Sequence, residues 1–445
     1  MLSDVSLKKE FLRALSGSSA VYLFGTFMGF LVGIQLARGL GVAGYGLYGS
    51  AMAAASLGAT IASGGVQLHA TREIAAYKAH SYGAGVSRLV AWSTHTVFAI
   101  SVALALGVGA YVLWGQGASL KVASAAMALT ILMAFLALTG AIVRGSGALI
   151  LGQALNVAIR PTVQSCLLLI GMLSIAGINP VIALSIACVA ALVAMFFGFR
   201  VIRRLWRYDG AQVLYDAANE RRIWRRAAWT MGLTTAVRAA EAALPLIVIG
   251  ALASMEQAGL YRVASSAIVL PSMAGTMITI MVPALVVRVY EDGKSDRLRR
   301  LAAASCIFMT APTIVIALVL WIFGGPLLTF AFGSGFEPAW TALALLTIGA
   351  VVSALGGISI ALLHAARKEG VVTQAFTLSL AVSAGGSLWF APQYGASGVA
   401  AAVLCGVAAR TAWLAYASRR FVGIDPTLPG ALHTIFFRRS RRNHA

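Results

Sequence analysis

The chain has 445 residues, of which 60% are hydrophobic and only 11% are charged. Soluble proteins carry about 25% charged residues, so this composition excludes an ordinary soluble domain and predicts a protein that crosses the membrane many times. The net charge of +20 would suit a nucleic-acid partner in a soluble protein. Here the basic residues fall in short loops between apolar runs, so nucleic acid is excluded as a main partner.

The first apolar run, 17–37, leads into the sequence ARGLGVAGYGLYG at 37–49, whose glycines have the spacing of a dinucleotide-binding motif. That motif follows a short strand and needs an acidic residue about 20 positions later. Here a run long enough to cross a bilayer precedes it, and ASGGVQ stands where the acid would be. We interpret the stretch as the turn of a helical hairpin, in which glycine permits positive φ and close helix approach. Tyr45 and Tyr48 would then suit the membrane interface.

Apolar runs continue along the whole chain, and the longest polar stretch separates six of them from six others. The turns that follow the first apolar run of each half are similar in sequence: AGYGLYGSA from Ala43 and AGLYRVASSA from Ala258. Such a duplication is a known transporter architecture, with the substrate path between the halves. We therefore predict an all-α polytopic membrane protein with about twelve transmembrane helices in two six-helix bundles. The predicted spans are 17–37, 46–66, 89–114, 122–143, 154–176, 180–201, 229–252, 263–287, 301–323, 340–363, 371–390 and 395–417. The predicted domains are the bundles 1–202 and 229–418, the cytoplasmic loop 203–228 and the basic cytoplasmic tail 419–445.

The 34 basic residues are distributed unevenly between the two sides of this arrangement. Loops on the side opposite the N-terminus carry only Arg38, Lys121 and Arg262, while the central loop alone carries eight arginine positions between 200 and 226. By the positive-inside rule, both termini face the cytoplasm.

Catalytic and metal-binding patterns are missing from the sequence. The cysteines and histidines are dispersed without ligand spacing, and no Ser/His/Asp or Cys/His grouping occurs. A membrane glycosyltransferase would need acidic residues in a large outside loop, and every predicted outside loop is short. We expect no enzyme activity, no cofactor and no metal.

Three further stretches accompany the hairpin turn in order along the chain: TREIA after it, FGSGFEPAWTAL before the tenth span and YGASGVAAA at the start of the twelfth. Through these patterns the chain resembles polysaccharide flippases of the multidrug/oligosaccharidyl-lipid/polysaccharide (MOP) exporter superfamily. The resemblance implies a V-shaped pair of bundles that opens alternately to each side of a bacterial inner membrane.

The implied substrate is an undecaprenyl-pyrophosphate-linked oligosaccharide repeat unit, moved from the inner to the outer leaflet for lipopolysaccharide or exopolysaccharide biosynthesis. The implied driving force is an ion gradient, and the implied partners are this lipid-linked oligosaccharide, membrane lipids and polysaccharide polymerase or assembly proteins. The alternative is a cation-coupled multidrug antiporter of the same superfamily, which usually needs several acidic residues in its lumen.

Inserting a charged side chain near the bilayer centre costs about 2.5–3.5 kcal/mol, so charged residues inside the spans indicate a structural or functional role. Arg238 and Glu241 are three positions apart on one helical face, with Arg238 roughly 14 Å into its span. They form either a structural ion pair or a functional pair, in which Arg238 contacts substrate phosphate and Glu241 binds the coupling ion. Pro245 cannot donate an N–H to the Glu241 carbonyl, which makes it a candidate hinge.

Two further arginines, Arg160 and Arg410, lie roughly 9 Å inside the cytoplasmic ends of the fifth and twelfth spans. Each either extends back to the cytoplasmic surface or lines a cavity with Arg238, where guanidinium groups match phosphate oxygens. Pro161 directly follows Arg160 and is the second candidate hinge.

Overall fold

The computed structural model describes residues 2–80, 82–174, 177–205, 217–292 and 295–431, and these ranges contain helices and no strand. Nine helices in this part of the chain are long and apolar enough to cross a bilayer. Two of them, Gly17–Ala79 and Glu369–Val422, each hold two spans that meet at a glycine, Gly41 and Gly395. The predicted all-α polytopic membrane fold is confirmed. Positions 206–216 of the predicted loop and 432–445 of the predicted tail lie outside the described residues.

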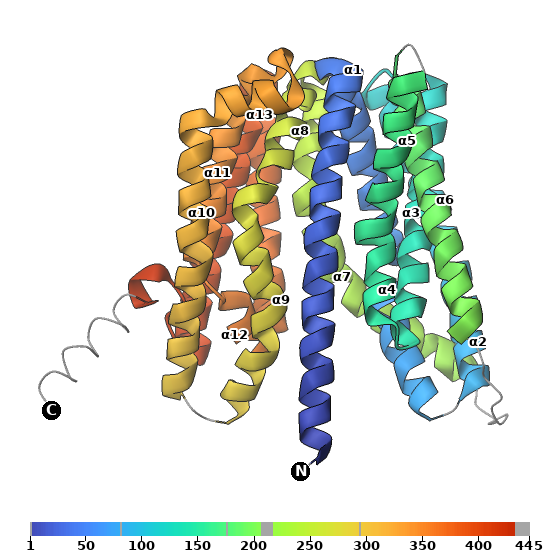
Figure 1. Cartoon of the computed structure of the whole chain (residues 1–445), viewed down its shortest axis with the longest axis vertical. Coiled ribbons are helices and arrows are strands. Elements are labelled where there is room, and N and C mark those ends of the chain that lie inside the picture. The colour runs from blue at the N-terminus through green and yellow to red at the C-terminus, as the bar shows by residue number, and fades with distance from the viewer. Residues whose placement is uncertain (1, 81, 175–176, 206–216, 293–294, 432–445) are drawn as a thin grey trace, which may run out of the picture. The chain divides into compact units, whose positions relative to one another are not determined.

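Figure 1 labels the helices of the described residues along the chain. In chain order they are α1 (Leu2–Ala79), α2 (Gly83–Ala110), η1 (Tyr111–Gly115), α3 (Leu120–Gly145), α4 (Leu149–Ala154), η2 (Leu155–Ile159), α5 (Arg160–Ser174), α6 (Pro180–Leu205), α7 (Ala217–Leu252), α8 (Met255–Ala267), α9 (Val269–Glu291), α10 (Ser295–Phe332), η3 (Ser334–Ala339), α11 (Trp340–Leu355), α12 (Ser359–Ala365) and α13 (Glu369–Val422).

The chain forms two compact units, Met1–Gly259 and Leu260–Ala445. Helix α7 belongs to the first unit because it packs along α1. The predicted division into six-helix bundles at the loop 203–228 concerns the parts that move during transport and stays a prediction.

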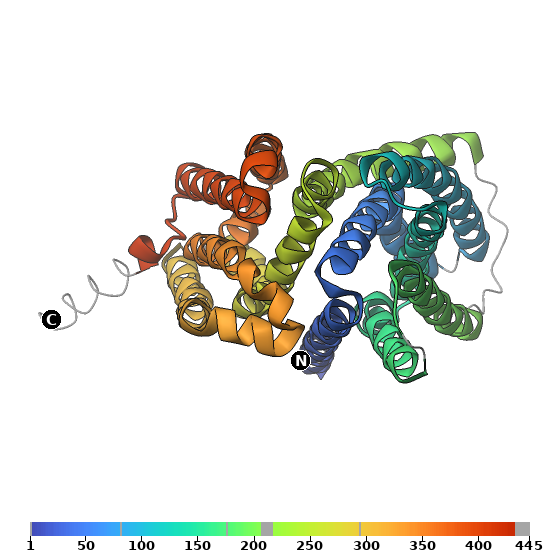
Figure 2. The same cartoon turned by 90° about the horizontal axis from the view of Figure 1, so that it is seen from above.

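In the first unit, α3 and α6 lie side by side (Figure 2). Both helices bury alanines completely, including Ala126 of α3 and Ala187 and Ala191 of α6. Small side chains let helix backbones approach closely, which strengthens dispersion contacts where lipid removes the hydrophobic driving force for association. The abundance of alanine and glycine in the sequence therefore has a direct role in packing.

Gly41 ends the first span and starts the second. Its φ of 66° lies in the left-handed region, which a residue with a Cβ atom adopts only with strain. Helix α1 therefore reverses direction here, and the prediction of a hairpin turn at ARGLGVAGYGLYG is confirmed. Gly395, with φ 55°, makes the corresponding turn inside α13.

The prediction that Tyr45 and Tyr48 face the membrane interface is wrong. Both side chains are buried, with 1% and 2% of their surfaces exposed. Their rings stack with centroids 6.5 Å apart, and Gln164 Nε2 of α5 donates a hydrogen bond of 3.0 Å to Tyr48 Oη. Close packing around the turn gives the Tyr48 hydroxyl a protein partner, so it has no need of the lipid headgroup region.

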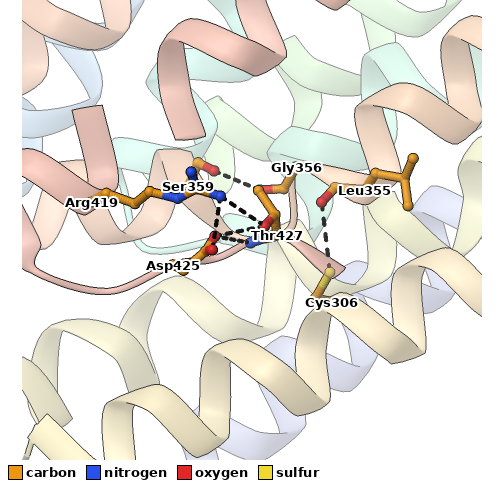
Figure 3. A network of polar contacts seen from close by, with 7 residues as sticks. All are labelled: Cys306, Leu355, Gly356, Ser359, Arg419, Asp425 and Thr427. Atoms are coloured by element: carbon orange, nitrogen blue, oxygen red, sulfur yellow. Dashed lines mark hydrogen bonds and ion pairs between the residues drawn. The ribbon is translucent and has the colours of Figure 1, made fainter. Parts of the chain in front are cut away.

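In the second unit, the chain after α13 folds back as a clasp formed by residues 423–431 (Figure 3). The Arg419 guanidinium lies 2.8 Å from Asp425 Oδ2, and Asp425 Oδ1 accepts hydrogen bonds from Thr427 N (3.0 Å) and Thr427 Oγ1 (2.6 Å). The clasp lies against the break between α11 and α12, where a Cβ atom on Gly357 would overlap the Pro426 carbonyl. The break is thus covered by the chain's own backbone.

Burial by itself raises the pKa of the Asp425 carboxyl, but the hydrogen bonds from Thr427 and the Arg419 guanidinium outweigh it. Together they hold that pKa below its ordinary value. A carboxyl with a lowered pKa in the folded state stabilises the fold above its unfolded pKa of about 3.9, and this contribution is lost as pH falls through the folded value.

We expect Asp425→Asn to destabilise the clasp by about 1 kcal/mol at neutral pH, because a partly exposed ion pair and two hydrogen bonds are weakened. Hydrogen exchange of residues 423–431, measured at neutral pH and at pH below 4, tests this. The protection factors, which correct for the slower intrinsic exchange in acid, should fall on acidification in the wild type and much less in the variant. Glu291→Gln, at an exposed carboxylate, is the control, and equal protection in all three proteins would contradict the role of Asp425.

Candidate functional site

The start of the fifth span combines a π-helical turn, a proline and an arginine. Residues Leu155–Ile159 form the π-helical turn η2, and the Arg160 N–H donates to the Leu155 carbonyl five residues back. Pro161 is buried and has no N–H for the Val157 carbonyl. Gly25 of the first span lies directly on that carbonyl, since a Cβ atom there would overlap it. The irregular turn is therefore held by backbone packing, and Arg160 projects from it partly buried.

Helix α7 carries the predicted pair Arg238 and Glu241. Arg238 is exposed, Glu241 is partly buried and Pro245 is buried, all within one continuous helix from Ala217 to Leu252. The arginine and the glutamate lie about one turn apart on the same side of the helix. Arg238 and Arg160 both belong to the first unit.

Arg410 belongs to the second unit, in the last span of α13. Its guanidinium carbon lies 5.0 Å from the centroid of the buried Phe376 ring, in the preceding span of the same helix pair. A cation over an aromatic face keeps part of the electrostatic stabilisation that water would give. Phe376 therefore lowers the cost of holding Arg410 inside the membrane.

The first of the repeated turns identified in the sequence packs, within the first unit, against the start of α8, where the second begins. A Cβ atom on Gly46 would overlap the Met255 carbonyl, and one on Gly259 would overlap the Val42 carbonyl. The contact is reciprocal: each turn presents a glycine to the backbone of the other. Sequence comparison found the similarity of the turns but not that they touch.

Glycine contacts continue along α1 and α7, and we call the whole set the glycine seam. A Cβ atom on Gly65 would overlap the Ala228 carbonyl, and Gly64 lies against the Thr235 side chain. Near the other end, Gly250 of α7 lies against the Ser50 side chain of the second span, and Tyr111 Oη of η1 donates to the Ile247 carbonyl of α7 (2.8 Å). The seam thus joins the second span to almost the full length of α7.

A cluster of aromatic and charged side chains fixes the N-terminal end of α7 to α1 and α2. Trp224 Nε1 donates to Tyr77 Oη at 3.3 Å, and the Trp224 ring packs on Trp92 with centroids 5.6 Å apart. Arg88 and Glu220 form an ion pair at 3.5 Å, with the Glu220 side chain only 10% exposed. Sequence patterns gave no signal for this cluster because its members are far apart in the chain.

This arrangement of helices is the fold of solved transporters of the MOP superfamily. Two solved structures that share the fold are a multidrug resistance MATE family transporter, inward-facing (TM-score 0.70, 14% identity, 91% of this chain and 98% of that one), and the lipid II flippase MurJ (TM-score 0.71, 14% identity, 94% and 90%). A MOP superfamily transporter from Pyrococcus furiosus gives a TM-score of 0.62 at 14% identity, covering 92% and 96%.

Residues 12–287 match the family described as polysaccharide biosynthesis protein, which is more than half of the chain. The chain therefore belongs to this family. No curated protein matches it. The resemblance stated from the sequence is confirmed, and the multi-pass membrane fold of a MOP transporter is shown.

The glycine seam generates a prediction. Gly46→Ala should destabilise the protein by about 1–3 kcal/mol, because the new methyl group must push two backbones apart. Gly29→Ala is the matched control in the same helix, since nothing lies within 4 Å of the position where its Cβ would stand. Thermal unfolding of both variants in detergent compares them. Equal unfolding temperatures would show that the seam does not need glycine at position 46.

Proposed function

We propose that this protein is a flippase that moves an undecaprenyl-pyrophosphate-linked oligosaccharide repeat unit from the inner to the outer leaflet of the cytoplasmic membrane. The observation that carries the proposal is the family match over residues 12–287. The fold shared with the lipid II flippase MurJ supports it, because the cargo of that flippase is itself a lipid. The product would serve lipopolysaccharide or exopolysaccharide assembly, with a polymerase or assembly protein as the next partner.

The arginines inside the spans have the chemistry that such a cargo needs. Arg160, Arg238 and Arg410 can offer guanidinium forks to a pyrophosphate, and each fork can bind two phosphate oxygens. The exposure of Arg238 leaves its head group accessible to a ligand. Phosphate binding is therefore assigned first to Arg238 in this proposal, with Arg160 and Arg410 as further contacts.

Transport against a gradient needs a source of free energy, and the chain contains no nucleotide-binding motif. Glu241 is the only carboxylate in the predicted spans and is proposed to bind the coupling ion. Pro245 removes the helical hydrogen bond to the Glu241 carbonyl, and Pro161 does the same for Val157. The proposal uses both prolines as hinges for alternating access of the bundles 1–202 and 229–418.

The proposed orientation places both termini in the cytoplasm. Arg72, Lys78 and Arg88 at one loop and the arginines at the start of α7 would then face the negative surface of the inner leaflet. In a bacterium this membrane is the inner membrane.

A cation-coupled multidrug antiporter is the second candidate, favoured by the equally good fold similarity to a MATE transporter. The predicted spans contain three arginines and one carboxylate. A cationic drug would be repelled by the arginines more strongly than it is attracted by the single carboxylate. The flippase is the better match to these charges.

The leaflet on which the sugar is exposed tests the proposed function. Deleting the gene should make the lipid-linked oligosaccharide accumulate on the cytoplasmic leaflet, because a pyrophosphate-linked sugar crosses lipid very slowly without a carrier. Inner-membrane vesicles of defined orientation, probed with a sugar-specific lectin, measure the exposed leaflet. Restoration by the cloned gene is the control. Normal outward display together with new sensitivity to cationic dyes would favour the antiporter instead.

Arg238→Ala should reduce flipping by about 10- to 100-fold at unchanged protein level, because a charge-assisted contact to phosphate is lost. Arg238→Lys, which keeps the charge but not the fork, should retain part of the activity. The same vesicle assay measures both variants. Arg297→Ala, at an exposed position at the start of α10, is the control. Full activity of a well-expressed Arg238→Ala protein would assign Arg238 a structural role.

A further inference from the structure

A groove of about 780 Å³ runs along the first unit between the second half of α1, α2 and α7. Its walls are apolar, with Ile61 from α1, Ile100 from α2 and Leu233 from α7. All three side chains are among the exposed large hydrophobics of the chain. None of the predicted substrate residues lines this groove.

One end of the groove is strongly basic. Arg222, Arg225 and Arg226 line it and are all exposed. Positions three and four apart share a helical face, so the three guanidinium groups project together. Within the described ranges none of them forms a salt bridge, and the neighbouring Glu220 is occupied by Arg88 at 3.5 Å. The positive charge at this end is therefore not neutralised by a nearby carboxylate in the described structure.

The length of the groove matches one leaflet of a bilayer. From Arg222 to Ala236, its most distant lining residue on α7, the helix rises roughly 21 Å at about 1.5 Å per residue. Half of a hydrocarbon core is about 15 Å thick, and the headgroup region adds several more. Trp229, which is 78% exposed, stands between the basic end and the apolar walls. Such amphipathic rings favour the boundary between headgroups and acyl chains.

We propose that this groove binds one anionic glycerophospholipid of the cytoplasmic leaflet, with its phosphate on Arg222, Arg225 and Arg226 and an acyl chain along Ile61, Ile100 and Leu233. Basic pockets between transmembrane helices on the cytoplasmic side are suited to such headgroups. The leaflet follows from the proposed orientation, but the site does not depend on which substrate is transported. A polyprenyl diphosphate fits less well, because its chain is far longer than the groove.

A lipid in this position would also support the glycine seam. Gly65, Ala228 and Gly232 belong to both the groove wall and the close contact between α1 and α7. An acyl chain packed on these residues would keep other lipids from entering between α1 and α7 and would hold the two helices together. The bound lipid would therefore raise the thermal stability of the folded protein.

Native mass spectrometry of the full-length protein tests the site. Protein released from nanodiscs of phosphatidylcholine with a small share of cardiolipin should retain one cardiolipin. The triple variant Arg222→Gln, Arg225→Gln, Arg226→Gln should bind it on the order of 100-fold more weakly, because each basic residue at the surface contributes several-fold to binding. The matched control replaces Arg297, Arg299 and Arg300, at the start of α10, with glutamine. It removes the same charge from the same predicted side and should retain the lipid.

A second variant keeps the arginines and fills the groove. Leu233→Trp should also lose the cardiolipin and the stability that it confers, even if the triple glutamine variant fails to insert. Equal loss in the groove triple and the α10 triple, or retention by both groove variants, would overturn the proposal. Displacement of the cardiolipin by an equal amount of undecaprenyl diphosphate would also overturn it, because the groove would then belong to a polyprenyl lipid.

Discussion

The backbone contact of the second span with α7 and the start of α8 is the constraint on which the first unit depends. In a lipid environment helices gain little from hiding apolar side chains, so their association depends on close packing and interhelical hydrogen bonds. The glycine seam supplies the first through Gly46, Gly65 and Gly259, each placed against a carbonyl of the facing chain. Tyr111 supplies the second by donating to the Ile247 carbonyl. Because the atoms in contact belong to the main chain, α7 and the start of α8 approach α1 this closely at residues that have no Cβ atom.

The arginines inside the predicted spans, and Arg144 at the end of the third span, differ in their surroundings. Arg144 donates to the Gly152 carbonyl at 3.4 Å, and Arg410 lies over Phe376, so each has a local partner that offsets the cost of its burial. Lys78 acts beside Arg144, donating to the Ser146 carbonyl at 2.7 Å and holding the turn between α3 and α4. Arg238 is exposed along α7, whereas Arg144, Arg160 and Arg410 are each partly buried. This contrast is why the proposed phosphate contact rests on Arg238 before the others.

The features that could be predicted from the sequence are those determined by residues close together in the chain. Span lengths, the polar loop and the hairpin turn at Gly41 follow from runs of neighbouring residues, and the turn's positive φ needs only glycine at one position. The burial of Tyr48 and the contact between the two repeated turns could not be predicted, because both depend on residues far away in the chain. For the same reason the residue types suggested Arg238 and Glu241, while nothing local suggested the cluster that contains Trp224.

The π-helical turn before Arg160 sets the direction in which every later residue of the fifth span points. An α-helix advances about 100° per residue, and a π-turn contains one residue more than an α-turn. The helix after Ile159 is therefore rotated by about 100° relative to an uninterrupted α-helix through the same start. Shortening the chain by one residue between 155 and 159 would restore α-helical geometry and leave Arg160 on its present face, whereas straightening the turn at unchanged length would swing Arg160 to a neighbouring face. The register of the backbone, rather than the identity of any side chain, thus determines which surface receives this positive charge.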